Sequence, residues 1–208
     1  GQAGAVWLDS GNGSFSRGRF EIIARSPRTS ARVESVTRDG SYRIKGSDQQ
    51  DLFELLDRWR VDQATAEGEL PFYGGTLGYL GYDIGRSLER LQAPGPDPTS
   101  LPVAWIGYYP WALVQDIQQQ RAWLVADSEA AMTEARIGLA EMDSDGTESA
   151  EFLLRSNWHS SSSEAAYGRS IARIQQLIQA GDCYQVNLAQ HFCAPYNGSP
   201  WQAYRLLR

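Results

Sequence analysis

The sequence is poor in lysine, cysteine and histidine, the side chains that often carry catalysis or bind metals. Of its 19 lysine and arginine residues, only Lys45 is a lysine, so chemistry that needs a lysine has one candidate. The two cysteines, Cys183 and Cys193, are too few for a disulfide framework or a cysteine-built zinc site. The two histidines, His159 and His191, do not stand in a metal-ligand spacing. These shortages exclude a disulfide-rich secreted domain and favour free thiols in a reducing, cytoplasmic compartment.

Long apolar runs are absent too, since no stretch approaches the roughly 18 residues that span a membrane. The first residues also lack the basic and apolar regions of a leader peptide. Acidic residues outnumber lysine and arginine by 25 to 19, which gives a net charge of -6. Negative charge repels phosphate backbones and anionic lipids. Nucleic acid and membrane surfaces are therefore not expected as partners.

Common catalytic and phosphate-binding motifs are missing as well. The sequence contains no GxxxxGK(S/T) loop and no GxSxG nucleophile elbow. Segment 71–86 alternates glycines with aromatic residues and leucines, but its spacing does not match a dinucleotide-binding fingerprint, so backbone packing is favoured over nucleotide binding. Cys183 has no evident cationic neighbour or histidine partner to activate its thiol. The residues therefore predict no catalytic or metal-ligating group in this chain.

Short β-prone runs, separated by turn residues, alternate irregularly with amphipathic segments. Strands are expected at 5–8, 20–24, 31–37, 41–45, 103–115, 121–127 and 184–192. Asp39-Gly40 predicts a tight hairpin turn between two of them. Helices are expected after an N-cap at Ser47, over 128–140, from a capping box at Ser161 to Gly181, and from Pro200 onward. Strand pairs without regular βαβ alternation predict an α+β fold of largely antiparallel β-sheets packed together, with helices outside.

A candidate ligand-binding loop lies near the N-terminus. Its residues are a hydroxyl, two guanidinium groups, a glycine and a phenylalanine, namely Ser10, Arg17, Arg19, Gly18 and Phe20. Guanidinium groups beside exposed backbone donors can hold a small carboxylate or an amino acid through charge-assisted hydrogen bonds. The alternative is an ordinary loop with solvated arginines, and the residues alone favour that alternative.

Three segments, in the same order, resemble the chorismate-utilising enzymes, a family that includes component I of aminodeoxychorismate synthase and component I of anthranilate synthase. The segments are Leu8–Gly11 with Arg19–Ile22, Pro71–Asp83, and Gly181–Gln190. Within the last segment, Cys183-Tyr184 and 187–189 are similar to the aminodeoxychorismate branch. Asp9 departs from both branches. An anthranilate synthase component I fragment and a non-catalytic amino-acid-binding module stay open as alternatives.

For the parent enzyme, the resemblance implies amination of chorismate to 4-amino-4-deoxychorismate, on the way to p-aminobenzoate and folate. It implies a glutamine amidotransferase component II as the ammonia source and magnesium held by glutamates, because a hard divalent cation suits carboxylate oxygens. In the family these glutamates, and a lysine in a Pro-Ile-Lys-Gly-Thr type motif, are expected outside this chain. Lys45 cannot replace that lysine. We therefore expect these 208 residues to be inactive by themselves.

The resemblance also implies a domain division and a pocket. Residues 1–145 correspond to the family's N-terminal region, 146–160 to a linker and 161–208 to the start of a truncated chorismate-binding domain. The loop at Ser10 and 17–20 corresponds to part of a pocket that binds tryptophan in some members of the family. Because further pocket residues are expected beyond Arg208, we expect at most weak tryptophan binding.

Overall fold

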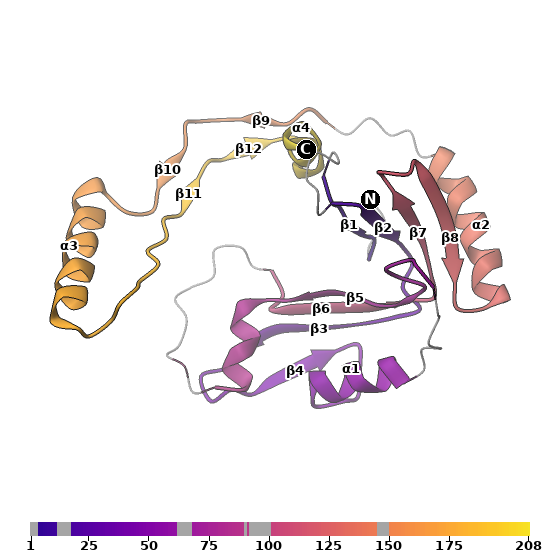
Figure 1. The fold of residues 1–208 in the computed structure, drawn as a ribbon, viewed down its shortest axis with the longest axis horizontal. Coiled ribbons are helices and arrows are strands. Elements are labelled where there is room, and N and C mark those ends of the chain that lie inside the picture. The colour runs from indigo at the N-terminus through magenta and orange to yellow at the C-terminus, as the bar shows by residue number, and fades with distance from the viewer. Residues whose placement is uncertain (1–3, 12–17, 62–67, 90, 92–100, 145–149) are drawn as a thin grey trace. The chain divides into compact units, whose positions relative to one another are not determined.

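The computed structural model describes residues 4–11, 18–61, 68–89, 91, 101–144 and 150–208 (Figure 1). Its contacts divide the chain into two compact units, Gly1–Asp145 and Gly146–Arg208. Each unit is described by itself below. The family regions expected for residues 1–145, 146–160 and 161–208 stay predictions. None of the helices in the described residues combines the length and the apolar character that a membrane span requires.

In its described residues, the first unit contains two antiparallel sheets and three helices. Its strands are β1 (Val6–Leu8), β2 (Phe20–Ala24), β3 (Thr29–Val36), β4 (Tyr42–Lys45), β5 (Gly75–Leu80), β6 (Ala104–Tyr109), β7 (Trp111–Asp116) and β8 (Arg121–Ala126). Its helices are α1 (Leu52–Val61), the 3₁₀ helix η1 (Tyr82–Ser87) and α2 (Glu129–Ser144). The strand orders are β1-β2-β7-β8 and β4-β3-β6-β5. The predicted α+β class with largely antiparallel sheets is confirmed.

The two sheets share one hydrophobic core. Ile22, Val114 and Val125 of the first sheet cluster with Tyr109 of β6, and Trp105 of β6 packs against them. Helix α2 covers β7 and β8 on the first sheet (Figure 1). A second core cluster forms where α1 and η1 pack on the second sheet; it contains Ala31, Val33, Ile44, Leu52, Leu55, Ile84, Ala104 and Ile106. The helices therefore lie outside the paired sheets.

Pro110 divides what the sequence predicts as one strand over 103–115. In the structure β6 ends at Tyr109 and pairs with β3 and β5, whereas β7 begins at Trp111 and pairs with β2 and β8. A proline has no backbone N–H to donate to a ladder. The prediction of a single strand is therefore wrong, and the break lets one continuous segment contribute to both sheets.

Two predicted helix caps are also displaced. Asp51, not Ser47, caps α1, because its Oδ1 accepts hydrogen bonds from the N–H groups of Phe53 and Glu54. Ser163, not Ser161, caps α3 (Glu164–Ala180) by accepting from the N–H of Ala166. In each case the side-chain oxygen of the residue directly before the helix accepts hydrogen bonds from N–H groups of the first turn, which have no partner within the helix.

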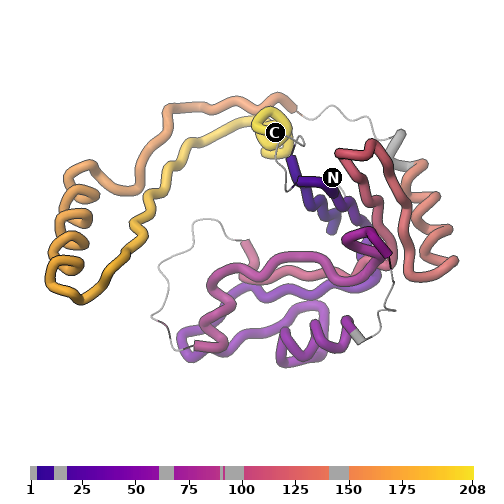
Figure 2. Tube along the Cα trace, in the orientation of Figure 1, coloured from indigo at the N-terminus to yellow at the C-terminus, as the bar shows by residue number. Residues whose placement is uncertain are grey.

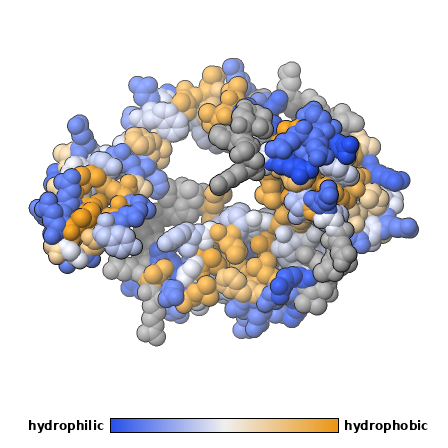
Figure 3. All heavy atoms as spheres, in the orientation of Figure 1, coloured by the Kyte–Doolittle hydropathy of each residue, from blue (hydrophilic) through white to orange (hydrophobic). Residues whose placement is uncertain are grey.

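The second unit contains α3, α4 (Pro200–Leu207) and two short ribbons. Strand β9 (Leu153–Leu154) pairs with β12 (Tyr196–Asn197), and β10 (His159–Ser160) pairs with β11 (Phe192–Cys193). Gly181 ends α3 in a left-handed conformation, φ 82°, as the sequence predicts. The strand predicted over 184–192 is wrong, since the ladder there is restricted to β11. Neither helix of this unit has a buried residue. Figure 2 traces the backbone of α3, and Figure 3 shows apolar side chains gathered along it.

Candidate functional site

Three strands of the first sheet bring aromatic and charged side chains together on its core-facing side. The register pairs Phe20 of β2 with Asp116 of β7, and Asp116 with Arg121 of β8. The neighbouring row contains Val114 and Trp123. Residues directly opposite each other in an antiparallel pair project from the same face. The end of this face therefore carries an ordered row of one aromatic ring, one carboxylate and one guanidinium group.

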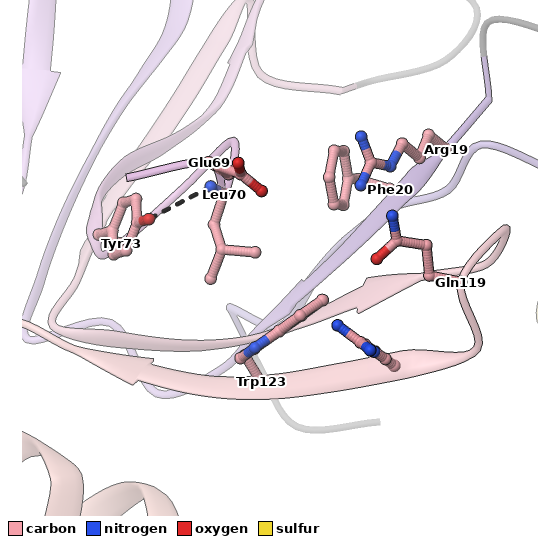
Figure 4. Close-up of a pocket in the computed structure, with 8 residues that line it drawn as sticks. Arg19, Phe20, Glu69, Leu70, Tyr73, Gln119 and Trp123 are labelled. Carbon is pink, nitrogen blue, oxygen red and sulfur yellow. Dashed lines mark hydrogen bonds between the residues drawn. The ribbon is translucent and has the colours of Figure 1, made fainter. Parts of the chain in front are cut away.

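A cavity of about 240 Å³ opens at this end of the sheet (Figure 4). Its lining comes from the start of β2, the segment before β5, and the β7–β8 hairpin: Arg19, Phe20, Glu69, Leu70, Tyr73, Gln119, Arg121 and Trp123. The hydroxyl of Tyr73 accepts a hydrogen bond from the N–H of Leu70 at 3.2 Å, which holds the middle segment in a turn. Cavities for drug-sized ligands are usually larger, from about 300 Å³. The space suits a small ligand.

Asp116 is the central charged group beside the cavity. Its side chain has no exposed surface, and its Oδ2 lies 2.8 Å from Nε and 2.7 Å from Nη2 of Arg19. Its Oδ1 accepts the N–H of Gln119 at 2.9 Å. The hydrogen bond from Arg19 is the main reason why the pKa of Asp116 lies below its ordinary value. One carboxylate therefore joins the start of β2 to the β7–β8 turn.

Arg19 is held on both sides. Its Cζ lies 4.6 Å from the centre of the Phe20 ring, and Figure 4 shows the guanidinium group against that ring. Such cation–π contacts add to the ion pair with Asp116. The backbone contributes too, because the carbonyl of Arg19 accepts the N–H of Ile117 at 2.9 Å. Arg19 is thus a fixed part of the cavity wall.

Arg121 and Glu69 differ from Arg19 because both are exposed and neither forms an ion pair within the described ranges. They have opposite charges and line the same cavity as the rings of Phe20, Tyr73 and Trp123. A guanidinium group binds a carboxylate through charge-assisted hydrogen bonds, and aromatic rings bury apolar ligand surface. The arrangement can therefore hold a small zwitterion that carries an apolar group.

The structure separates the five residues of the predicted loop. Arg19 and Phe20 line the cavity, whereas Ser10 and Gly18 do not. The Ser10 hydroxyl donates to the Phe20 carbonyl at 2.6 Å. A Cβ on Gly18 would lie 2.6 Å from the Ser10 carbonyl oxygen, so this close approach requires glycine. Arg17 lies outside the described residues.

Most of the cavity lining could not be anticipated from the sequence. Tyr73 belongs to the glycine and aromatic segment that the composition singles out, and Gln119 to a predicted hairpin turn. Nothing in their spacing relates either residue to Arg19. The pairing of β2 with β7 brings Arg19 to Asp116, which lies 97 residues away at the start of the turn that contains Gln119.

The cavity does not fit a divalent metal. Among the residues that the structure describes, no three His, Cys, Asp or Glu side chains gather to hold an ion. Of the two carboxylates near the cavity, Asp116 is already paired with Arg19. Magnesium prefers several oxygen ligands around it. Glu69 alone does not supply such a set.

Comparison with known proteins identifies relatives over nearly the whole chain. A family model described as chorismate binding enzyme matches residues 4–208. Aminodeoxychorismate synthase component 1 of Escherichia coli (strain K12) is 34% identical over 205 residues, which cover 96% of this chain and 44% of that protein. Anthranilate synthase component 1 of Pseudomonas putida is 29% identical over 235 residues, covering 100% and 46%.

A solved structure shows the same fold. Anthranilate synthase component I from Streptococcus pneumoniae TIGR4 matches with a TM-score of 0.71 and 24% sequence identity. The match covers 100% of this chain and 48% of that chain. The chain thus spans about half the length of the relatives that it matches.

Proposed function

We propose, because this chain belongs to the chorismate binding enzyme family, that it is part of an aminodeoxychorismate synthase component I. The observation that carries the proposal is the 34% identity to an aminodeoxychorismate synthase component 1 over 96% of the chain. The anthranilate synthase component 1 of Pseudomonas putida is less similar, at 29%. In the proposed reaction, ammonia replaces the 4-hydroxyl group of chorismate to give 4-amino-4-deoxychorismate.

The proposal includes a glutamine amidotransferase as the partner that supplies ammonia. It places the protein in the cytoplasm, which the two free cysteines, Cys183 and Cys193, support. The expected magnesium ion has no set of ligands in the described part of the chain, so no step of the proposal runs through it.

We propose further that the 208 residues do not aminate chorismate by themselves. The support is that the sequence contains no Pro-Ile-Lys-Gly-Thr type motif and only one lysine, Lys45, which lies in β4. The test compares these residues with the protein in its full natural length, using chorismate, ammonium and magnesium. Turnover by the 208 residues would refute this part of the proposal.

The product separates the two branches of the family. Formation of anthranilate releases pyruvate from chorismate, whereas formation of 4-amino-4-deoxychorismate retains it. We expect the full-length protein to convert chorismate without releasing pyruvate, which a coupled lactate dehydrogenase assay measures directly. Release of one pyruvate for each chorismate consumed would instead assign the protein to the anthranilate branch.

The cavity beside Arg19 is proposed to bind an aromatic amino acid such as tryptophan. The supporting observation is that three aromatic rings line the same small space as Arg121 and Glu69, two side chains of opposite charge that form no ion pair with any residue the structure describes. This role is binding, not catalysis. Calorimetry with L-tryptophan tests it, and absence of saturable binding to the full-length protein would refute it.

A further inference from the structure

We propose that Arg121, and not Arg19, binds the carboxylate of the amino acid in this cavity. The inference rests on the proposed aromatic amino-acid ligand and names the residue that recognises its charge. It differs from the expectation drawn from sequence, which places ligand recognition on Ser10 and the loop of residues 17–20. The reason is that one buried carboxylate, that of Asp116, neighbours both arginines but pairs with Arg19.

Asp116 lies between the two arginines and pairs with one of them. Arg121 lies directly opposite Asp116 in the β7–β8 ladder. Phe20 lies opposite Asp116 in the β2–β7 ladder, and Arg19 is the residue before Phe20. Two nitrogen atoms of Arg19 contact Oδ2 of Asp116 at 2.8 and 2.7 Å. Arg121 has no ion pair in the described part of the chain. The charge of Arg19 is therefore compensated by Asp116, whereas no carboxylate of the described residues pairs with Arg121.

This difference decides which arginine favours an anionic ligand. A carboxylate that approaches Arg19 must compete with, or lie beside, the buried negative charge of Asp116, and like charges at short distance repel. A carboxylate that approaches Arg121 meets an exposed cation. Arginine also offers a planar set of donors that matches both oxygens of a carboxylate.

The second oxygen of Asp116 contributes by shaping the turn that leads into Arg121. Its Oδ1 accepts the N–H of Gln119, and the carbonyl of Arg19 accepts the N–H of Ile117. Both contacts secure the β7–β8 hairpin immediately before Arg121. Asp116 is therefore a positioning residue, and Arg121 is the residue that contacts the ligand.

Glu69 completes the charge complementarity of the site. Glu69 belongs to the segment before β5 and lines the same cavity as Arg121, to which it is opposite in charge. It forms no ion pair with any of the residues described. A zwitterionic amino acid has one group for each of these side chains, whereas a simple anion leaves Glu69 unmatched. The geometry therefore favours an amino acid over a dicarboxylate or a phosphate.

The test measures how three related ligands bind to the full-length protein by calorimetry: L-tryptophan, tryptamine, which lacks the carboxylate, and indole-3-propionate, which lacks the amine. We expect wild type to prefer L-tryptophan over tryptamine by about tenfold, as one charge-assisted interaction provides. Arg121→Gln should abolish that preference and leave the unfolding temperature unchanged. Arg43→Gln is the matched control, because Arg43 is another exposed strand arginine outside the cavity.

Further variants separate the two arginines and the two proposals. Glu69→Gln should abolish the preference for L-tryptophan over indole-3-propionate. Arg19→Gln should lower the unfolding temperature and weaken all three ligands alike. Loss of the carboxylate preference in Arg19→Gln but not in Arg121→Gln would overturn this inference alone. Absence of binding of all three ligands to wild type would overturn the ligand proposal and, with it, this inference.

Discussion

Replacing Tyr109 by phenylalanine removes a single hydroxyl group from the shared core of the two sheets. Tyr109 is fully buried at the end of β6, and its Oη donates to the carbonyl of Gly4 at 2.5 Å. Without the hydroxyl, the Gly4 carbonyl loses its protein donor at a hydrogen bond whose tyrosine side is fully buried. An unsatisfied buried acceptor costs about 1–3 kcal/mol, so we expect the free energy of unfolding to fall by about 2 kcal/mol.

Tyr79→Phe provides the matched control. The hydroxyl of Tyr79 also donates to a backbone carbonyl, that of Pro102 at 2.9 Å, but the residue is 43% exposed. Water replaces the lost donor there, so we expect a change below about 0.5 kcal/mol. Urea unfolding, followed by tryptophan fluorescence, measures the free energy of unfolding of both variants. We expect the slope of this free energy against urea concentration to equal that of wild type. Equal losses in the two variants would refute the role of burial.

The pH dependence of the Tyr109 variant supplies an independent check. Burial raises the pKa of Tyr109 above its ordinary value of about 10. Above pH 10 the unfolded chain therefore ionises this tyrosine while the folded protein does not, and the stability that the group contributes is lost as the pH rises. We expect the difference between wild type and Tyr109→Phe to shrink above pH 10. A constant difference across that range would contradict the reasoning.

Two further predictions concern the surroundings of the cavity. Hydrogen bonding to Arg19 lowers the pKa of Asp116, so its contribution to stability is present above the ordinary aspartate pKa of about 4 and is lost as the pH falls below it. Asp116→Asn should lack this acid dependence, and acid titrations of thermal unfolding check it; unchanged curves would contradict the ion pair. Gly18→Ala should destabilise by about 1–3 kcal/mol, because its Cβ would lie 2.6 Å from the Ser10 carbonyl oxygen. Gly85→Ala, where nothing lies within 4 Å of the added Cβ, should be tolerated in the same melting assay.

The features that the sequence predicts well depend on neighbours a few residues away. Gly40 adopts φ 86° in the β3–β4 hairpin, and Gly181 adopts φ 82° at the end of α3, because glycine tolerates both conformations. Errors occur where two local signals compete. Ser47 and Asp51 can both cap a helix, and only the actual start of α1 selects Asp51. Similarly, alternation over 184–192 is typical of a strand, but a strand also needs a partner to pair with.

The amino-acid order by itself determined the strand-rich α+β class, the end of α3 at Gly181, the start of α4 at Pro200, and the motifs through which the chain resembles its family. Each of these depends on short-range periodicity, turn chemistry or a short local motif. Only the tertiary structure decided which charges meet. Arg19 and Asp116 are 97 residues apart, and they contact each other because the register of β2 on β7 places Phe20, the residue after Arg19, opposite Asp116. That register follows from which faces are buried in the shared core, and a shift of β2 by one residue would turn Phe20 away from the cavity.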